Sequence, residues 1–455
     1  MKNPEKTAAI SRREDDQLVV EYRSTSSLQP YVQNARTHPK KQVLQIVESV
    51  KAFGFNNPIL IDENYEIIAG HGRLEAAKLL GLSIVPTIWI THLSDAQKQK
   101  LRLADNKIAD NAGWDEKLLA FELKHIIEID TDFDVTVTGF DAPEIDIIIK
   151  NLDEGDDSDK LDSVPPIEES TSATSLLGDL WQLGDHRLSC GDATKPVSFE
   201  HLLGDERAQM VITDPPFNVR VDGHVGGLGK THHREFPMAS GEMSETEFID
   251  FLHSTTSNLA ASSIDGSVHF IFMDWRHQLE LLKATKGNYD SILNLCVWNK
   301  SNGGMGSFYR SKHELVFVFK FGRSPHINNV ELGRHGRNRT NVWDYPGVNT
   351  FGNDRMKTLS LHPTVKPVAL VSDAILDCST RGSIVLDCFC GSGTTIIAAE
   401  QAGRRAYTME LDPLYVDVAV RRWRELGGAP VIHAVTGRTF DEIAEERSRE
   451  VCHAG

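Results

Sequence analysis

Two short motifs in this 455-residue chain carry side chains that could do chemistry together, and each follows a short apolar run. The first is Asp214, Pro215, Pro216 and Phe217, and the second runs from Asp387 through Phe389, Gly391 and Gly393 to Thr394. Successive prolines remove backbone donors and stiffen a loop, so that a carboxylate and the carbonyls around it project as fixed acceptors. We expect the first motif to bind an amino group.

The second motif indicates a nucleotide-like ligand. Gly391 and Gly393 remove side chains where the backbone turns and a ligand approaches, and a helical pattern begins at the next residue. The third glycine of a dinucleotide fingerprint is absent, because Ile396 holds its position. About 20 residues past the glycines, a strand pattern ends in Glu410, where a carboxylate can bind ribose hydroxyls.

An amino group on a nucleobase explains why these residue types occur together. The exocyclic amine of adenine or cytosine is a poor nucleophile, because its lone pair is delocalised into the ring. Hydrogen bonds from its N–H groups to the Asp214 carboxylate and the Pro215 carbonyl favour a more tetrahedral nitrogen, which can attack a sulfonium methyl group held in line. Phe217 can stack on a base that is rotated out of the duplex.

The elements that must position these motifs alternate along the chain. Strands are predicted at 207–213, 266–273, 291–298, 315–320, 383–388 and 405–410, and helices at 244–260, 366–379 and 394–402. This order predicts an α/β fold with a mostly parallel, Rossmann-like doubly wound sheet. Ligands of such sheets bind at the carboxyl ends of the strands, where both motifs lie.

Together the motifs resemble those of the amino-group DNA methyltransferases of the beta, or permuted, group over roughly residues 176–430. The resemblance implies S-adenosylmethionine as the methyl donor and makes the Asp-Pro-Pro-Phe motif catalytic. It assigns donor binding to Asp192, to Thr364 and Lys366 in a His-Pro-Thr-Val-Lys-Pro run, and to Asp387, Phe389, Gly391, Gly393, Thr394 and Glu410. It also implies a site-specific enzyme of the restriction-modification type.

The same resemblance favours adenine as the target. Within the family, Asp in the first motif position is typical of N6-adenine methylation and Ser is typical of N4-cytosine methylation, so Asp214 predicts adenine. N4-cytosine methylation stays open as the alternative. Methylation of cytosine C5 is not expected, because its thiolate usually follows a proline, and none of the six cysteines does.

Basic residues between the two motifs predict the surface for double-stranded DNA. From Trp298 to Tyr345 the local charge is positive, in a chain whose formal net charge is -17. The candidate contacts to phosphates and guanine edges are Lys300, Arg310, Arg334, Arg337 and Arg339. The target-recognition segment is expected at about 321–360.

Residues 18–150 predict a smaller α+β domain with a helical extension. The run Ala-Gly-His-Gly-Arg, with Gly70, Gly72 and Arg73, resembles the turn of the ParB/sulfiredoxin-like nuclease domain, and the resemblance covers roughly residues 18–110. The family's Arg pair is reduced here to one Arg, so the resemblance implies a module that binds nucleic acid, a nucleotide or a phosphate rather than a nuclease. A ParB-like DNA-binding protein with an inactive methylase half is therefore a second hypothesis for the whole chain.

Composition predicts the remaining boundaries. Residues 1–17 are expected to be disordered, the acidic stretch 151–175 a flexible linker and 431–455 a tail. The helix predicted at 96–110 is expected to expose its basic residues Lys98, Lys100, Arg102 and Lys107 to solvent. With no apolar run that could span a bilayer and no signal-peptide core, we expect a cytoplasmic protein, with a homodimer as one assembly state. The cysteine spacing predicts neither a metal site nor disulfides.

Overall fold

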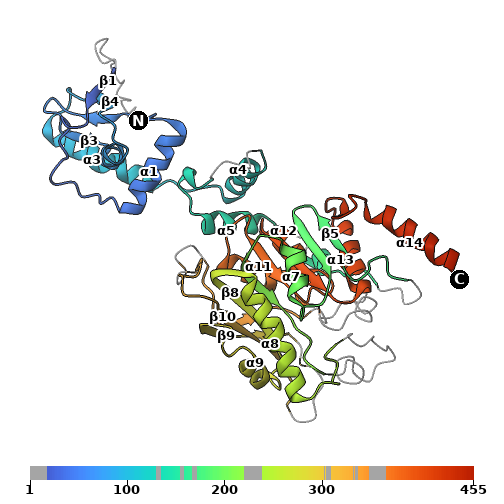
Figure 1. The fold of residues 1–455 in the computed structure, drawn as a ribbon. Coiled ribbons are helices and arrows are strands. Elements are labelled where there is room, and N and C mark those ends of the chain that lie inside the picture. Colours follow the sequence, from blue (N-terminus) through green and yellow to red (C-terminus); the bar gives the residue numbers. More distant parts are fainter. Residues whose placement is uncertain are drawn as a thin grey trace, which may run out of the picture. The chain divides into compact units, whose positions relative to one another are not determined.

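The computed structural model divides the chain into two compact units, Met1–Ile145 and Asp146–Gly455 (Figure 1). The structure describes residues 18–129, 135–153, 158–166, 172–219, 238–301, 303, 309–330, 333, 337–347 and 365–454. Each unit has an apolar core of its own. The boundary falls inside helix α5 (Ala142–Asp153), ahead of the acidic segment in which a linker was predicted.

The first unit is the predicted small α+β domain. Its elements are β1 (Val20–Ser24), α1 (Lys40–Phe53), β2 (Ile59–Ile61), β3 (Ile67–Ala69), α2 (His71–Leu79), β4 (Ile84–Trp89), α3 (Asp95–Asp110), α4 (Glu116–Ile129) and the 3-10 helix η1 (Val135–Thr138). The strands form a sheet in the order β1-β4-β2-β3. Ile59, Ile61 and Ile67 are fully buried with Leu74 of α2, so the sheet packs on that helix. The predicted α+β character of this domain is confirmed.

The prediction that α3 exposes its basic side chains is wrong for Lys98 and Arg102. Lys98 is 3% exposed, and its ammonium group pairs with Glu63 Oε1 at 2.8 Å. Arg102 is 8% exposed, pairs with Glu66 and stacks on the Tyr31 ring. Buried charges need partners, and the acidic turn between β2 and β3 supplies them. This pairing joins segments that are distant in sequence, so the local pattern does not reveal it.

The second unit is built on a ten-stranded sheet in the order β11-β9-β10-β8-β7-β12-β13-β6-β5-β14. Its strands are β5 (Leu180–Leu183), β6 (His186–Cys190), β7 (Ala208–Thr213), β8 (Ser263–Met273), β9 (Ser291–Asn299), β10 (His313–Lys320), β11 (Val342–Asp344), β12 (Ile384–Asp387), β13 (Arg405–Glu410) and β14 (Val431–His433). Neighbours from β8 to β6 run parallel, whereas β10, β5 and β14 pair antiparallel. The predicted strands are confirmed; the middle of the sheet is parallel, and at one end β11 also pairs parallel with β9.

Helices cover both faces of this sheet, because successive strand residues point to opposite sides. On one face, Met210 and Val385 pack with α11 (Val368–Cys378), α12 (Thr394–Gln401) and α13 (Pro413–Glu425). On the other face, Val211 and Leu386 pack with α7 (Pro196–Leu203) and α8 (Glu245–Ala261), and α9 (Gln278–Ala284) lies beside α8. Figure 1 shows these helices around the sheet. The doubly wound architecture is confirmed.

Part of the predicted linker, residues 151–175, packs on the second unit. Helix α5 continues to Asp153, and a short helix α6 (Ser158–Leu161) follows. The Asp162 carboxylate accepts a hydrogen bond of 2.8 Å from the Val368 N–H at the start of α11, and Val164 is buried. A carboxylate at this position satisfies an otherwise unpaired helix donor. The acidic composition was therefore a poor guide to flexibility at these residues.

Residues 431–455, predicted to be a tail, contain two further elements. β14 pairs with β5 at the edge of the large sheet, and α14 (Phe440–Ala454) follows it. Phe440 and Ile443 are buried in the main core. The prediction of a tail is corrected accordingly. Among the helices that the structure describes, none has the length and apolar character needed to cross a membrane.

Candidate active site

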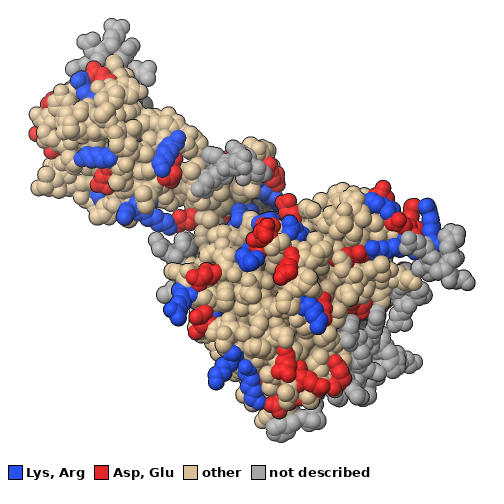
Figure 2. Space-filling model, in the orientation of Figure 1, with Lys and Arg blue, Asp and Glu red and all other residues tan. Residues whose placement is uncertain are grey.

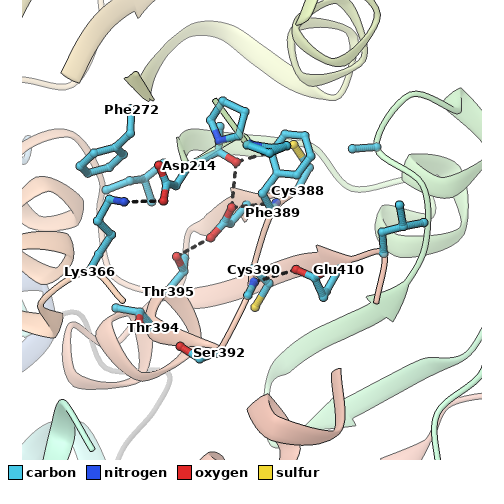
Figure 3. Close-up of a pocket in the computed structure, with 18 of the residues that line it drawn as sticks. Asp214, Phe272, Lys366, Cys388, Phe389, Cys390, Ser392, Thr394, Thr395 and Glu410 are labelled. Atoms are coloured by element: carbon cyan, nitrogen blue, oxygen red, sulfur yellow. Dashed lines mark hydrogen bonds and ion pairs between the residues drawn. The ribbon is translucent and has the colours of Figure 1, made fainter. Parts of the chain in front are cut away.

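A pocket opens at the carboxyl edge of the parallel strands, and its acidic residues follow four neighbouring strands. Asp214 follows β7, Asp387 ends β12, Glu410 ends β13 and Asp192 follows β6. Because these strands are adjacent and parallel, their ends meet on one side of the sheet. The pocket is lined by Gly191, Asp192, Ala193, Ile212, Thr213, Asp214, Pro215, Pro216, Phe217, Met238, Phe251, Phe272, Val365, Lys366, Val371, Asp387, Cys388, Phe389, Cys390, Gly391, Ser392, Thr394, Thr395, Glu410 and Leu411 (Figure 3).

The glycine loop between β12 and α12 has the conformation that the sequence predicted. Gly391 and Gly393 have φ angles of 52° and 84°, which favour glycine. A Cβ atom at Gly393 would lie 3.0 Å from the Cβ of Ala419. The Thr394 hydroxyl faces inward and accepts a 3.0 Å hydrogen bond from the buried Arg422. The contacts with Ala419 and Arg422 therefore hold the loop in place, and the loop backbone lines the pocket.

Asp387 holds the loop together through its own hydrogen bonds. Its Oδ1 accepts from the Thr213 hydroxyl at 2.8 Å and from the Phe389 N–H at 3.1 Å, and its Oδ2 accepts from the Thr395 hydroxyl at 2.6 Å. The side chain is buried, and burial raises the pKa of its carboxyl group. This geometry ties β7 to the glycine loop, so Asp387 positions both motifs.

Two further carboxylates line the side of the pocket beside the glycine loop. Glu410 accepts a hydrogen bond of 2.9 Å from the Gly391 N–H and another of 2.9 Å from the Asp412 N–H. Burial raises the pKa of Glu410 to about 7. Asp192 Oδ1 accepts from the hydroxyl and the N–H of Thr194. Each of these carboxylates has about four lone-pair sites and uses two of them here, so both residues can accept from ligand hydroxyl or amino groups.

Asp214 has two oxygen atoms in different surroundings. The ammonium group of Lys366 binds Oδ2 (Figure 3). Oδ1 is buried and has no hydrogen-bond partner among the residues that the structure describes. An unpaired buried acceptor is costly and is typical of a site that receives its partner from a ligand. Burial raises the pKa of Asp214 to about 6, while Lys366 lowers it and Glu314 raises it.

Lys366 lines the pocket beside the catalytic motif. It was assigned to donor binding, yet its ammonium group lies between Asp214 and Glu314, 3.2 Å from Glu314 Oε2. Burial lowers the pKa of Lys366, and the two carboxylates raise it above its usual value, so the lysine remains charged. Glu314, at the start of β10, was missed because nothing in the sequence links it to a motif a hundred residues away.

The predicted DNA-contact residues that the structure describes all have partners within the protein. Arg337 is 7% exposed and Arg339 is largely buried, and both pair with Asp373 and Asp377 of α11. The prediction that these two residues bind DNA is therefore corrected to a structural role. Lys300 pairs with Glu314, and Arg310 donates to the Gly303 carbonyl at 2.8 Å. On the face shown in Figure 2, basic and acidic side chains are interspersed rather than gathered into one basic surface.

Several predicted positions lie outside the described residues. These are Thr364 and Arg334, together with parts of the predicted target-recognition segment 321–360. The pocket residues that sequence reasoning missed include Phe251, Phe272 and Leu411. Their apolar side chains belong to ordinary core patterns, so no local signal distinguishes them. The described residues hold no group of side chains arranged to bind a metal ion.

The turn between β3 and α2 in the first unit has the predicted glycine conformation. Its arginine, Arg73, is hydrogen-bonded within the protein. Gly70 has a φ angle of 106°, and a Cβ atom at Gly72 would lie 3.1 Å from His38 and Ile46. Arg73 donates hydrogen bonds to the backbone carbonyls of Asn57 at 2.7 Å and Pro58 at 2.6 Å. The guanidinium group therefore closes this turn onto β2.

Three protein families match parts of the chain. Residues 208–421 match the DNA methylases, residues 11–107 the ParB N-terminal domain and residues 117–174 the ParB-methyltransferase HTH domain. The HTH match covers α4 to α6, where we had predicted only a helical extension and a linker.

Curated relatives match each end of the chain. The ParB-like nuclease domain-containing protein YnaK of Escherichia coli K12 is 53% identical over 85 residues, which are 19% of this chain and 98% of YnaK. The type II methyltransferase M.HpaI of Haemophilus parainfluenzae is 25% identical over 258 residues, 52% of this chain and 74% of M.HpaI. The DNA adenine methyltransferase YhdJ of E. coli K12 is 42% identical over 82 residues, 18% of this chain and 26% of YhdJ.

Proposed function

The chain belongs to the ParB-like nuclease domain proteins through its N-terminal domain and to the DNA methylases through residues 208–421, and we propose that it transfers a methyl group from S-adenosylmethionine to N6 of adenine in double-stranded DNA. The observation that carries this proposal is the buried, unpartnered Oδ1 of Asp214 in the pocket beside the glycine loop. The order of the two motifs, with the catalytic one first, is that of the permuted group.

The pocket supplies the groups that this chemistry needs. Asp214 Oδ1 accepts one N–H of the target amine, and the Pro215 carbonyl accepts the other, since the proline pair stiffens the loop and holds that carbonyl as a fixed acceptor. Two acceptors favour a more tetrahedral nitrogen, whose lone pair becomes available for attack. The ring of Phe217 stacks on the extruded base. The amine proton released on methylation passes toward the Asp214 carboxylate.

The residues beside the glycine loop fit the donor. S-adenosylmethionine supplies an electrophilic methyl group when bound. Glu410 and Asp192 offer acceptors for ribose hydroxyls and for the donor's amino groups, and Gly391 lets the backbone approach. Phe389 and Leu411 give the apolar surface that a purine ring needs. Thr394 and Asp387 support the loop from behind through the contacts described above.

Adenine is preferred over cytosine on two grounds. Asp at position 214 is the residue typical of the N6-adenine enzymes in the family. YhdJ, which is 42% identical over 82 residues, is named as a DNA adenine methyltransferase. N4-cytosine methylation remains the enzymatic alternative, because the same acceptor pair also suits the amine of cytosine.

DNA is the partner implied by both families, and the finer assignments are proposals. We infer that the HTH match at 117–174 and the ParB-like domain bring the methylase domain to DNA. A phosphate or nucleotide at Gly70 and Gly72 would meet backbone N–H groups at the start of α2. Arg73 would first have to leave the Asn57 and Pro58 carbonyls. A homodimer is likewise a proposal, tested by sedimentation.

The test is methyl transfer from labelled S-adenosylmethionine to unmethylated double-stranded DNA, followed by digestion and separation of the nucleosides. We expect the label in N6-methyladenine. Label in N4-methylcytosine would change the target base from adenine to cytosine, and the chain would still be a DNA methyltransferase. DNA that stays unlabelled, from protein that binds DNA, would favour the ParB-like protein with an inactive methylase half.

A further inference from the structure

A charged side chain outside the catalytic motif reaches the catalytic carboxylate through Lys366. Glu314 lies at the start of β10, which runs antiparallel to β8 with Leu315 opposite Met273. An antiparallel strand brings its beginning, not its end, to the carboxyl edge of its parallel neighbours. Glu314 therefore stands beside the pocket although no residue near it in sequence belongs to a motif.

The contacts form a continuous chain of four charges. Lys366 binds Asp214 Oδ2, and its ammonium group lies 3.2 Å from Glu314 Oε2. Glu314 Oε1 in turn binds the ammonium group of Lys300, which follows β9. The Glu314 and Lys366 side chains are 16% and 8% exposed. Such pairs are weakly screened, so each charge feels the others strongly.

Aromatic rings enclose the lysine at the centre of this chain. The Lys366 ammonium nitrogen lies 5.1 Å from the ring centroid of Phe272, 5.9 Å from that of Phe217 and 5.9 Å from that of Trp298. Ring faces at such distances attract a cation and exclude water from it. The ammonium position is therefore set by the rings and by the carboxylates on its two sides.

We propose that Glu314 is a positioning residue for methyl transfer: it holds the Lys366 ammonium from the side opposite Asp214, so that Oδ2 stays occupied while Oδ1 stays directed at the target amine. This inference rests on the proposed function. Without Glu314, the ammonium group has only Asp214 as its carboxylate partner among the described residues, and it can slide between the two oxygens. The acceptor for the amine is then lost for part of the time.

The same arrangement governs how basic Asp214 is. The charged groups that face it are Lys366, Glu314 and Asp387, with Lys300 behind Glu314. Burial raises the pKa of Asp214, Lys366 lowers it and Glu314 raises it. When Glu314 is neutralised, its charge no longer opposes that of Lys366, so the pKa of Asp214 falls. A less basic carboxylate is a weaker acceptor for the amine protons.

The experiment compares the full-length chain with Glu314→Gln in steady-state methyl transfer over a range of pH. We expect kcat to fall about 10- to 100-fold, the acid limb of the kcat profile to move to lower pH, and the affinity for S-adenosylmethionine to stay within about twofold. The matched control is Glu206→Gln, which removes a carboxylate paired with Arg405 at 2.8 Å and lying outside the pocket. It should leave kcat and the pH profile unchanged.

Glu314→Asp guards against misfolding as an explanation, because it keeps the charge and shortens the side chain. It should recover part of kcat and return the acid limb toward the wild-type position. If Glu314→Gln leaves kcat and the acid limb unchanged, the positioning role of Glu314 is wrong. The proposed function still stands in that case, because the wild-type chain is active. A wild-type chain that binds the donor but transfers no methyl group overturns the proposed function, and this assignment with it.

Discussion

At the scale of single residues, the site depends on the unequal surroundings of one carboxylate. Lys366 takes Oδ2 of Asp214, and Oδ1 faces the pocket unpartnered. The two prolines that follow keep the backbone from turning back onto that oxygen. The carboxylate is therefore prepared for an N–H donor before any substrate arrives, which reduces the reorganisation needed during the reaction.

Activity should fall in mild acid for two separable reasons. Asp214 acts as the carboxylate, and its pKa is raised to about 6, so kcat at saturating donor should fall as the pH drops through about 6. The pKa of Glu410 is raised to about 7, so the KM for the donor should rise as the pH drops through about 7. The measurement is kcat and donor KM from pH 4.5 to 9. A kcat that stays level down to pH 4.5 would contradict the first assignment.

Glu410→Gln should weaken donor binding more than it slows transfer. The amide keeps the shape but loses the charge and one acceptor, so we expect a loss of about 1.5–3 kcal/mol in donor binding, or roughly 10- to 100-fold in Kd. Calorimetric titration with S-adenosylmethionine measures this directly. An unchanged Kd would exclude Glu410 from the donor site. Asp412, two residues later, offers no substitute, because it caps α13.

Residues in local motifs were predictable, and residues in long-range pairs were not. Asp214, Gly391 and Glu410 follow strands at recognisable spacings, and the pocket brings them together. Glu314 has no such context. Arg337 looked like a phosphate contact because a cluster of arginines usually lies on the surface, and its acidic partners lie in a helix 36 and 40 residues away.

At the scale of elements, two acidic residues one turn apart on α11 bind basic residues from other parts of the chain. Asp373 and Asp377 form ion pairs with Arg337 and Arg339. Asp373 Oδ1 also lies 2.8 Å from Nζ of Lys150 in α5. Residues four apart share one helix face, so a single face of α11 holds the cluster. Burial makes each of these charges depend on its partners.

Arg337→Ala should destabilise the methylase domain without a specific effect on DNA. Removing one partner of a buried ion pair costs about 3–5 kcal/mol, so the thermal unfolding midpoint should fall by several degrees. DNA affinity, measured well below that midpoint, should stay near the wild-type value. Arg276→Ala is the control, because its guanidinium side chain is 59% exposed. A loss of DNA affinity at unchanged stability would restore the original DNA-contact interpretation.

The elements themselves were mostly predictable, because each strand and helix of the core has its own apolar period. The exceptions were those whose packing depends on partners elsewhere. β14 is a short strand that pairs only at the sheet edge, and the described part of 151–175 is held by contacts with the methylase domain rather than by its own apolar residues. Acidic composition predicted flexibility where Asp162 in fact caps a helix.

At the scale of the whole molecule, two units with separate cores divide at residues 145 and 146. Helix α5 crosses that boundary, and its second half belongs to the methylase unit. Asp146 is buried and pairs with Arg404 at 2.8 Å, and Arg404 is itself fully buried. The folded methylase unit therefore begins within α5, and not after the acidic segment.

Two truncations separate these boundaries. A chain of residues 141–455 should unfold at nearly the same temperature as the methylase unit of the full chain, because it keeps Asp146 and Asp162. A chain of residues 176–455 should lose about 3–5 kcal/mol or fail to fold, because Arg404 loses its buried partner. Calorimetric unfolding compares them. Equal stability of the two truncations would support the linker that the composition predicted.

The division of labour between the units follows from sequence only in outline. Both family resemblances were visible in short motifs. The HTH match at 117–174 was not, since its helices carry no motif that reasoning from residue types could single out. The boundary also escaped prediction, because it depends on a buried ion pair rather than on composition.

The most direct test of the central claim is methyl transfer by Asp214→Asn alongside donor binding in the same preparation. Asparagine keeps the shape of aspartate and removes its charge and one acceptor. We predict that labelled N6-methyladenine falls at least about 100-fold while S-adenosylmethionine binds with a Kd within about threefold of wild type. Methyl transfer at near the wild-type rate by Asp214→Asn would contradict the role given to this carboxylate.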